Sequence, residues 1–207
     1  SQVSKPNGWD DVTCERIRTD NNLGVYVADA RQGDTSGKAT IILPQWSDGT
    51  LHNPLSQERA KATAAIEGGV VLYVDNPGVE PDLPEMPGYI KQALLSGDFK
   101  PGAIKQWDAI AQGLDYVGLD FDSVSRVLGA SLGAHVASAI VRTAPEKVRL
   151  KRLDLWETAG LDKKSNFLQF AANFMIHGGD GYADILKNNP EWVAYLRDVN
   201  GARELAK

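Results

Sequence analysis

A serine stands midway between two glycines in the segment Gly129–Gly133, which reads Gly-Ala-Ser-Leu-Gly. A short apolar strand pattern precedes this segment, and a helix pattern follows from Leu132. A turn from strand to helix at this spacing accepts only small flanking residues and leaves the Ser131 hydroxyl exposed above the sheet as a potential nucleophile. We therefore expect a φ near or above zero at Ser131. The Leu132 N–H should point from the helix N-terminus toward an oxyanion that develops on an attacked carbonyl group.

Short apolar, β-branched runs alternate with longer helical patterns along the chain, an order typical of a parallel sheet with helices on its faces. The expected fold class is therefore α/β, a mostly parallel sheet with helices on both faces. The two leading strands should form an antiparallel hairpin, and Trp107 and Trp156 lie in apolar patterns that predict core positions. The predicted strands are residues 12–18, 23–31, 39–43, 70–74, 124–128 and 150–156, and the predicted helices are residues 54–67, a segment near Tyr89, 105–117 and 132–143.

The length of 207 residues is typical of one compact domain. After Gly160 no further strand pattern occurs, and residues 165–207 are helical in pattern apart from a glycine-rich break and Pro190. We expect a core of six strands and their helices over residues 1–160, and a helical, lid-like segment over residues 161–207 that packs on it.

The chain resembles the α/β-hydrolase family, in the Gly129–Gly133 motif and in the order of strands and helices around it. The resemblance covers about three-quarters of the sequence, from the opening hairpin through strand 150–156. It implies a serine hydrolase with Ser131 as the nucleophile. Asp75–Gly78 looks like the Asp-x-Pro-Gly turn that many members carry after the fourth strand, where its role is mostly structural. Residues after Gly160 resemble the lid that some members insert, and the resemblance implies that the later strands, with the family's catalytic histidine, are missing.

In this family a loop after the third strand supplies a second N–H to the oxyanion. The matching stretch is Leu43–Gly49, so the resemblance implies that the N–H of Gln45 or of Trp46 joins that of Leu132. The family often has His-Gly at this point, whereas this chain has Pro44 followed by Gln45, a departure from the family pattern.

A serine hydroxyl needs a general base, and the sequence holds three histidines. His135 lies four residues after Ser131 on a helix that descends from the turn, so its imidazole should pack away from the hydroxyl. None of the three stands where the family has its base, so we expect no imidazole within hydrogen-bond reach of the hydroxyl. His52 falls in a polar loop, and His177, in the helical tail, is the candidate base if the chain is active. Glu157, at the end of the last predicted strand, is the candidate acid; the alternative is a helix cap or a rim charge.

Composition argues against several other classes of protein. Lys and Arg number 22 against 27 Asp and Glu, and the net charge of -5 and pI of about 5.2 argue against nucleic-acid binding. Cys14 is the only cysteine, so no intramolecular disulfide can form and a cytoplasmic location is expected. No apolar run reaches the ~20 residues of a membrane span, and we expect no secretory leader. Without a dinucleotide-binding glycine motif or a zinc motif, we expect no cofactor and no metal.

Two hypotheses follow for function. The first is a serine hydrolase that acts on a carboxylic ester or a related acyl substrate, once its triad is complete. The alternative is a catalytically inactive, truncated relative that acts in binding or assembly. In both cases strand 150–156 should be a sheet edge whose unpaired N–H and C=O groups invite pairing. We expect cover by the helices of residues 165–207 together with self-association, so the expected partners are a small acyl substrate and either a second copy or a missing C-terminal segment.

Overall fold

The computed structural model describes residues 5–34, 36–45, 49–51, 53–96, 98–143 and 151–156. The chain divides into two compact units, one of Ser1–Pro87 with Phe99–Ala159 and the other of Gly88–Asp98 with Gly160–Lys207. The first unit holds the sheet. The described part of the second unit contains one helix, α2 (Gly88–Leu95). Residues 161–207 lie outside the described residues, so the helical lid stays a prediction.

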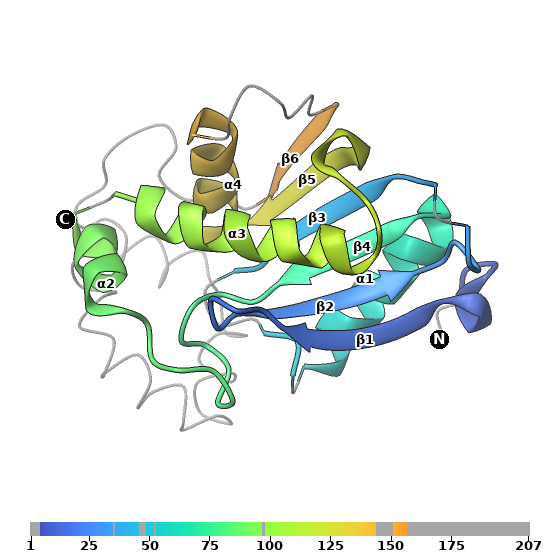
Figure 1. The fold of residues 1–207 in the computed structure, drawn as a ribbon, viewed down its shortest axis with the longest axis horizontal. Coiled ribbons are helices and arrows are strands. Elements are labelled where there is room, and N and C mark those ends of the chain that lie inside the picture. The colour runs from blue at the N-terminus through green and yellow to red at the C-terminus, as the bar shows by residue number, and fades with distance from the viewer. Residues whose placement is uncertain are drawn as a thin grey trace, which may run out of the picture. The chain divides into compact units, whose positions relative to one another are not determined.

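An antiparallel hairpin forms one edge of the sheet (Figure 1). It consists of β1 (Thr13–Arg18) and β2 (Gly24–Asp29). The Thr19 N–H closes the turn between them by donating to the Leu23 carbonyl at 2.9 Å, and Asn22 in this turn has a φ of 60°. This arrangement confirms the predicted hairpin.

Six strands of the described chain form one sheet in the order β1-β2-β4-β3-β5-β6. β2 is antiparallel to β4, whereas β4, β3, β5 and β6 are parallel to one another. Every residue of the central strands β3 and β4 is buried, as expected where a parallel sheet is covered on both faces. The predicted α/β class is confirmed. The remaining strands are β3 (Ala39–Leu43), β4 (Val70–Val74), β5 (Val124–Ala130) and β6 (Arg152–Trp156), and short 3-10 helices, η1 (Trp9–Asp11) and η2 (Phe121–Ser123), precede β1 and β5.

Helices cover both faces of the sheet (Figure 1). On one face α1 (Pro54–Glu67) packs its alanines in a cluster that includes Tyr73. On the other face α3 (Lys100–Tyr116) and α4 (Leu132–Thr143) pack in a cluster that includes Leu72. These two neighbours on β4 enter different clusters because successive side chains of a strand point to opposite faces.

Two details of the predicted elements were wrong. α3 begins at Lys100 and not at Lys105, because Pro101 stands in its first turn, where the missing N–H of proline is not needed. Trp156 was expected in the core but is 50% exposed, since it is the last residue of β6. Trp107 does pack against the core, as predicted.

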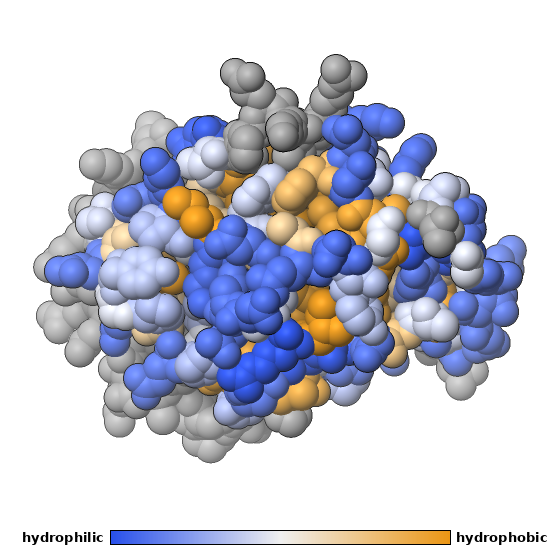
Figure 2. Space-filling model, in the orientation of Figure 1, coloured by the Kyte–Doolittle hydropathy of each residue, from blue (hydrophilic) through white to orange (hydrophobic). Residues whose placement is uncertain are grey.

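No helix in the described part of the chain is both long and apolar enough to cross a membrane. The face shown in Figure 2 is mainly hydrophilic, with apolar side chains gathered right of centre. Large exposed apolar side chains come from several separate elements, a distribution that is normal for a protein surface. They are Leu55, Ile66, Tyr89, Ile104, Tyr116, Val141 and Trp156.

Candidate active site

Ser131 forms the whole connection between β5 and α4, because the strand ends at Ala130 and the helix begins at Leu132. Its φ of 51° lies in the left-handed region that few residues other than glycine adopt. The Ser131 N–H donates to the Trp156 carbonyl of β6 at 2.9 Å, and its own carbonyl accepts from the Ala134 N–H at 3.0 Å. These bonds hold a conformation that costs about 1–3 kcal/mol elsewhere. The predicted strained turn is confirmed.

Gly129 and Gly133 allow the strand, the helix and a neighbouring loop to approach one another closely. A Cβ on Gly129 would lie 2.7 Å from the Ala134 Cα. A Cβ on Gly133 would overlap the Leu43 carbonyl oxygen and lie 2.6 Å from that of Pro44. Because these neighbours are backbone atoms, a side chain at either glycine would push α4 away from the sheet. The glycine spacing is therefore required by contacts between the strand, the helix and the end of β3.

The loop after β3 lies against the N-terminus of α4, since carbonyl groups at the end of β3 stand beside Gly133. Gln45 follows on this loop and is exposed. Leu132 is the first residue of α4, so its N–H has no acceptor within the helix. The structure thus places two of the predicted oxyanion residues at the same edge of the sheet, where the parallel strands β3 and β5 both end. Trp46, the alternative to Gln45, lies outside the described residues.

Asn76, which follows β4, holds the start of this loop. The Asn76 Nδ2 group donates to the Gln45 carbonyl at 2.9 Å and to the Pro44 carbonyl at 3.3 Å. Its Oδ1 accepts from Nε2 of Gln106 on α3 at 3.1 Å. Two amide side chains in series therefore connect α3 to the loop.

Two carboxylates in the segment after β4 hold the far end of the loop. Asp75 Oδ1 accepts from both the N–H and the hydroxyl of Thr50, each at 2.9 Å. Glu80 Oε1 accepts from the Leu51 N–H at 2.6 Å. Arg16 on β1 completes the group with an ion pair to Asp75 at 3.0 Å. The turn after β4 therefore anchors the loop after β3 at both ends.

Burial dominates the electrostatics of Asp75, whose side chain has no exposed surface. Burial raises the pKa of Asp75 to about 6; Arg16 and the Thr50 hydroxyl act in the opposite direction, and the Glu80 carboxylate adds to the rise. Arg16 is shared with Asp82, which it contacts at 2.6 Å. This shared guanidinium holds the pKa of the Asp82 carboxyl below its usual range.

His135, on α4, stacks its imidazole on the Phe99 ring, with centroids 4.8 Å apart and an angle of 10° between the planes. That His135 packs away from the nucleophile stays a prediction. Among the residues that the structure describes, the Ser131 hydroxyl has no hydrogen-bond partner. The candidate base His177, the candidate acid Glu157 and the loop residue His52 all lie outside the described residues.

No protein-family model matches the sequence, and no curated protein sequence matches it significantly. Solved structures do match. The Francisella virulence factor BioJ is similar with a TM-score of 0.51 and 12% identity over 74% of this chain and 45% of that protein. A bacterial heroin esterase is similar with a TM-score of 0.50 and 14% identity over 75% of this chain and 46% of the esterase. This chain has the α/β-hydrolase fold. It spans less than half the length of either of these two proteins.

The buried polar groups that contact the loop of this α/β-hydrolase fold were not predicted from the sequence. Asp75–Gly78 was interpreted only as a turn, and no role was predicted for Asn76, Gln106 or Thr50. One signal was available: Gln106 is a polar residue on the helix face that also carries Ala103 and Ile110, and such a residue needs a buried partner.

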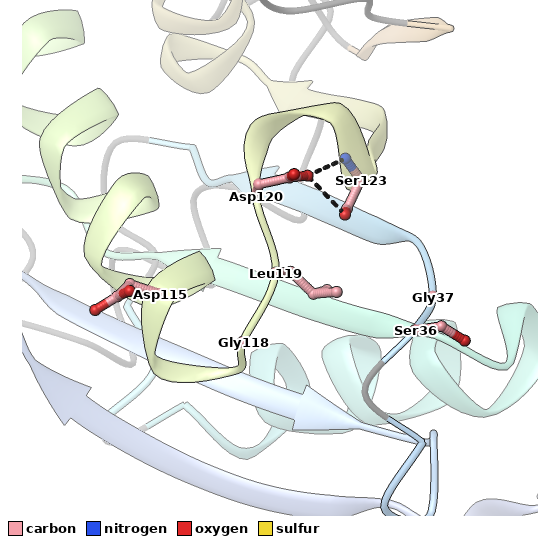
Figure 3. Close-up of a pocket in the computed structure, with 7 residues that line it drawn as sticks. All are labelled: Ser36, Gly37, Asp115, Gly118, Leu119, Asp120 and Ser123. Carbon is pink, nitrogen blue, oxygen red and sulfur yellow. Dashed lines mark hydrogen bonds between the residues drawn. The ribbon is translucent and has the colours of Figure 1, made fainter.

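A pocket of about 550 Å³ lies at the amino ends of the parallel strands, opposite to the end that carries Ser131 (Figure 3). It opens beside Ser36 and Gly37, which precede β3, and Ser123, which precedes β5, whereas Ser131 follows β5. Its Asp120 carboxylate points to Ser123 and accepts from that residue's N–H and hydroxyl. Ligands of open α/β sheets bind at the carboxyl ends of the strands, so this pocket is not the candidate active site.

Proposed function

We propose that the protein is a serine hydrolase that acts on a carboxylic ester or a related acyl substrate. The observation that carries this proposal is the positive φ of Ser131 on a one-residue connection between β5 and α4. Backbone strain of this kind persists only where the surrounding structure holds it, and it is concentrated at functional sites. Here it holds the half-buried Ser131 at the carboxyl ends of the parallel strands. An ester substrate is also in keeping with the name of one solved structure with this fold, the bacterial heroin esterase.

In the proposed reaction, Ser131 Oγ attacks the carbonyl carbon of the ester. The new C–O bond forms as the hydroxyl proton passes to a base and the carbonyl electron pair moves onto the oxygen. The Leu132 N–H and the N–H of Gln45 or Trp46 donate to this oxyanion. When it collapses, the bond to the alcohol breaks and the alcohol leaves with the proton. Water then attacks the acyl-serine in the same way, releasing the acid and restoring the Ser131 hydroxyl.

His177 is the proposed base and Glu157 the proposed acid that orients it, both from their places in the sequence. His135 is left out of this role because the helix should direct its imidazole away from the Ser131 hydroxyl. His177→Gln should lower the reactivity of Ser131 by about 100-fold or more, since general base catalysis contributes at least that factor.

A fluorophosphonate probe tests this proposal. The reagent forms a bond between Ser131 Oγ and phosphorus, and fluoride leaves with the electron pair of the P–F bond, so only an activated serine reacts at a useful rate. We expect the unmodified protein to be labelled on Ser131, and Ser131→Ala to remain unlabelled. Ser138→Ala, which removes the next serine along α4, is the matched control and should be labelled normally. Failure of the unmodified protein to react would reject the hydrolase proposal in favour of a binding or assembly role.

A further inference from the structure

Two buried carboxyl groups contact the far end of the loop after β3. Asp75 has no exposed side-chain surface, and Glu80 is 5% exposed. Asp75 Oδ1 accepts the N–H of Thr50 at 2.9 Å. Glu80 Oε1 accepts the N–H of Leu51 at 2.6 Å. Thr50 and Leu51 belong to no helix or strand, so these two side chains supply the hydrogen bonds that hold residues 49–51 in place.

Backbone atoms cover both carboxyl groups closely. A Cβ on Gly24 of β2 would overlap Asp75 Oδ2. A Cβ on Gly49 of the loop would overlap Glu80 Oε1. Thr50 has no exposed surface and is bonded to Asp75. Movement of Thr50 out of this position breaks that bond and admits water to the Asp75 carboxyl group, so release of the loop and hydration of Asp75 occur together.

Negative charge exceeds positive charge around Asp75. Arg16 of β1 places Nη2 3.0 Å from Asp75 Oδ2, but the same guanidinium contacts Asp82 at 2.6 Å. The Glu80 carboxylate lies close enough to oppose the ionisation of Asp75. The other groups that contact Asp75 do not titrate, and they are the Gly24 backbone, the Thr50 hydroxyl and the Gln106 amide. Within the described chain, one guanidinium is thus shared by two carboxylates, and a third carboxylate acts on Asp75.

The affinity of Asp75 for a proton depends on whether the loop is closed. Burial raises the pKa of Asp75 to about 6, and the Glu80 carboxylate adds to the rise, while Arg16 and Thr50 act against it. In water the pKa of an aspartate is about 3.9. Because the closed form binds the proton more tightly, its advantage is full below about pH 4 and is lost as the pH rises through 6. The two pKa values allow a change of up to about 100-fold in the opening equilibrium.

A neutral Asp75 can keep its contacts with the loop. Its Oδ1 still accepts the Thr50 N–H, and a proton on Oδ2 can be donated to the Thr50 hydroxyl oxygen, 3.1 Å away. Protonation therefore removes the buried charge without removing the bonds that hold Thr50.

We propose that Asp75 is a pH-sensitive latch for the loop after β3: residues 49–51 are held most firmly while Asp75 carries a proton, and they open more readily once it is an anion beside Glu80. The same loop begins beside Gly133 in the first turn of α4, so the pH controls how firmly a loop at the candidate active site is held. The latch acts whether or not Ser131 reacts, because none of its residues takes part in acyl transfer.

Amide hydrogen exchange measured by NMR tests the latch, since the exchange rate of an amide relative to its intrinsic rate reports how often that amide opens. We expect the protection factor of the Thr50 amide to fall by about tenfold between pH 5 and pH 7 in the wild type. In Asp75→Asn it should change by less than about twofold over this range, because an amide side chain does not titrate. Asp29→Asn is the matched control. It removes a carboxylate of β2 that binds Arg31, and it should keep the tenfold fall.

Any of three results in the wild type and Asp75→Asn would overturn the latch. Protection of Thr50 that is constant or rises with pH contradicts the direction of the effect. An equal fall in Asp75→Asn assigns the effect to another group. Exchange of Thr50 no faster than that of the buried Val70 amide of β4 means that global unfolding, and not movement of the loop, frees Thr50. If Asp75→Asn does not fold, Glu80→Gln takes its place, because it keeps an oxygen for the Leu51 N–H and removes the neighbouring charge. The fall in protection should then be smaller than in the wild type, and an equal fall would overturn the latch.

Discussion

Gly133→Ala places a methyl group where backbone atoms already stand. The added Cβ would overlap the Leu43 carbonyl oxygen and lie 2.6 Å from that of Pro44, against 3.4 Å for an ordinary contact. β3 is held between two strands, so α4 must move by roughly 1 Å, and overpacking of this kind costs about 3 kcal/mol. The higher helix propensity of alanine offsets about 1 kcal/mol. We expect the free energy of unfolding to fall by about 2 kcal/mol.

Urea denaturation followed by circular dichroism measures this change, with Gly88→Ala as the matched control. Gly88 is the first residue of α2, and no atom lies within 4 Å of a Cβ added there, so its variant should stay within about 0.5 kcal/mol of the wild type. In Gly133→Ala the displaced Leu132 N–H should also slow labelling of Ser131 by about 100-fold. A Gly133→Ala protein with wild-type stability and labelling would refute the close packing of α4 against the end of β3.

Three further predictions concern a buried carboxyl, an ion pair and a histidine. Burial raises the pKa of Asp75 to about 6 in the folded protein, above about 3.9 in the unfolded chain, so its contribution to stability is fully present below about pH 4 and is lost as the pH rises through 6. The difference in unfolding free energy, wild type minus Asp75→Asn, should fall by about 2 kcal/mol between pH 4 and 7, and a difference that rises would contradict the assignment. Arg126→Met removes ion pairs to Asp154 on β6, at 2.5 Å, and to α1, and should lower the unfolding free energy by about 1–2 kcal/mol, whereas an unchanged urea midpoint would disprove that contribution. His135→Phe keeps an aromatic ring against Phe99 and should leave the labelling rate within about twofold, so a large loss would make His135 the base.

The sequence by itself determined the features that depend on neighbours within a few residues. Hydrophobic alternation predicted the hairpin and the parallel strands, and the helix 132–143 has the predicted bounds in α4. The strained conformation of Ser131 was predictable because a strand and a helix joined at a serine, with a glycine two residues away on each side, allow few connections. Local steric contacts and hydrophobic periodicity depend only on residues that are close together in the chain. They can therefore be predicted without knowing which distant residues come into contact.

Only the tertiary structure decided which polar side chains contact the loop at the candidate site. Asn76 binds a carbonyl 31 residues away and Asp75 an arginine 59 residues away, and these pairs meet because β4 lies between β2 and β3 in the sheet. Burial of Trp156 was wrongly predicted for a similar reason, since an apolar pattern does not reveal what lies opposite the end of a strand. A polar side chain can be satisfied by many partners along a chain, and packing of the whole sheet selects which one it meets.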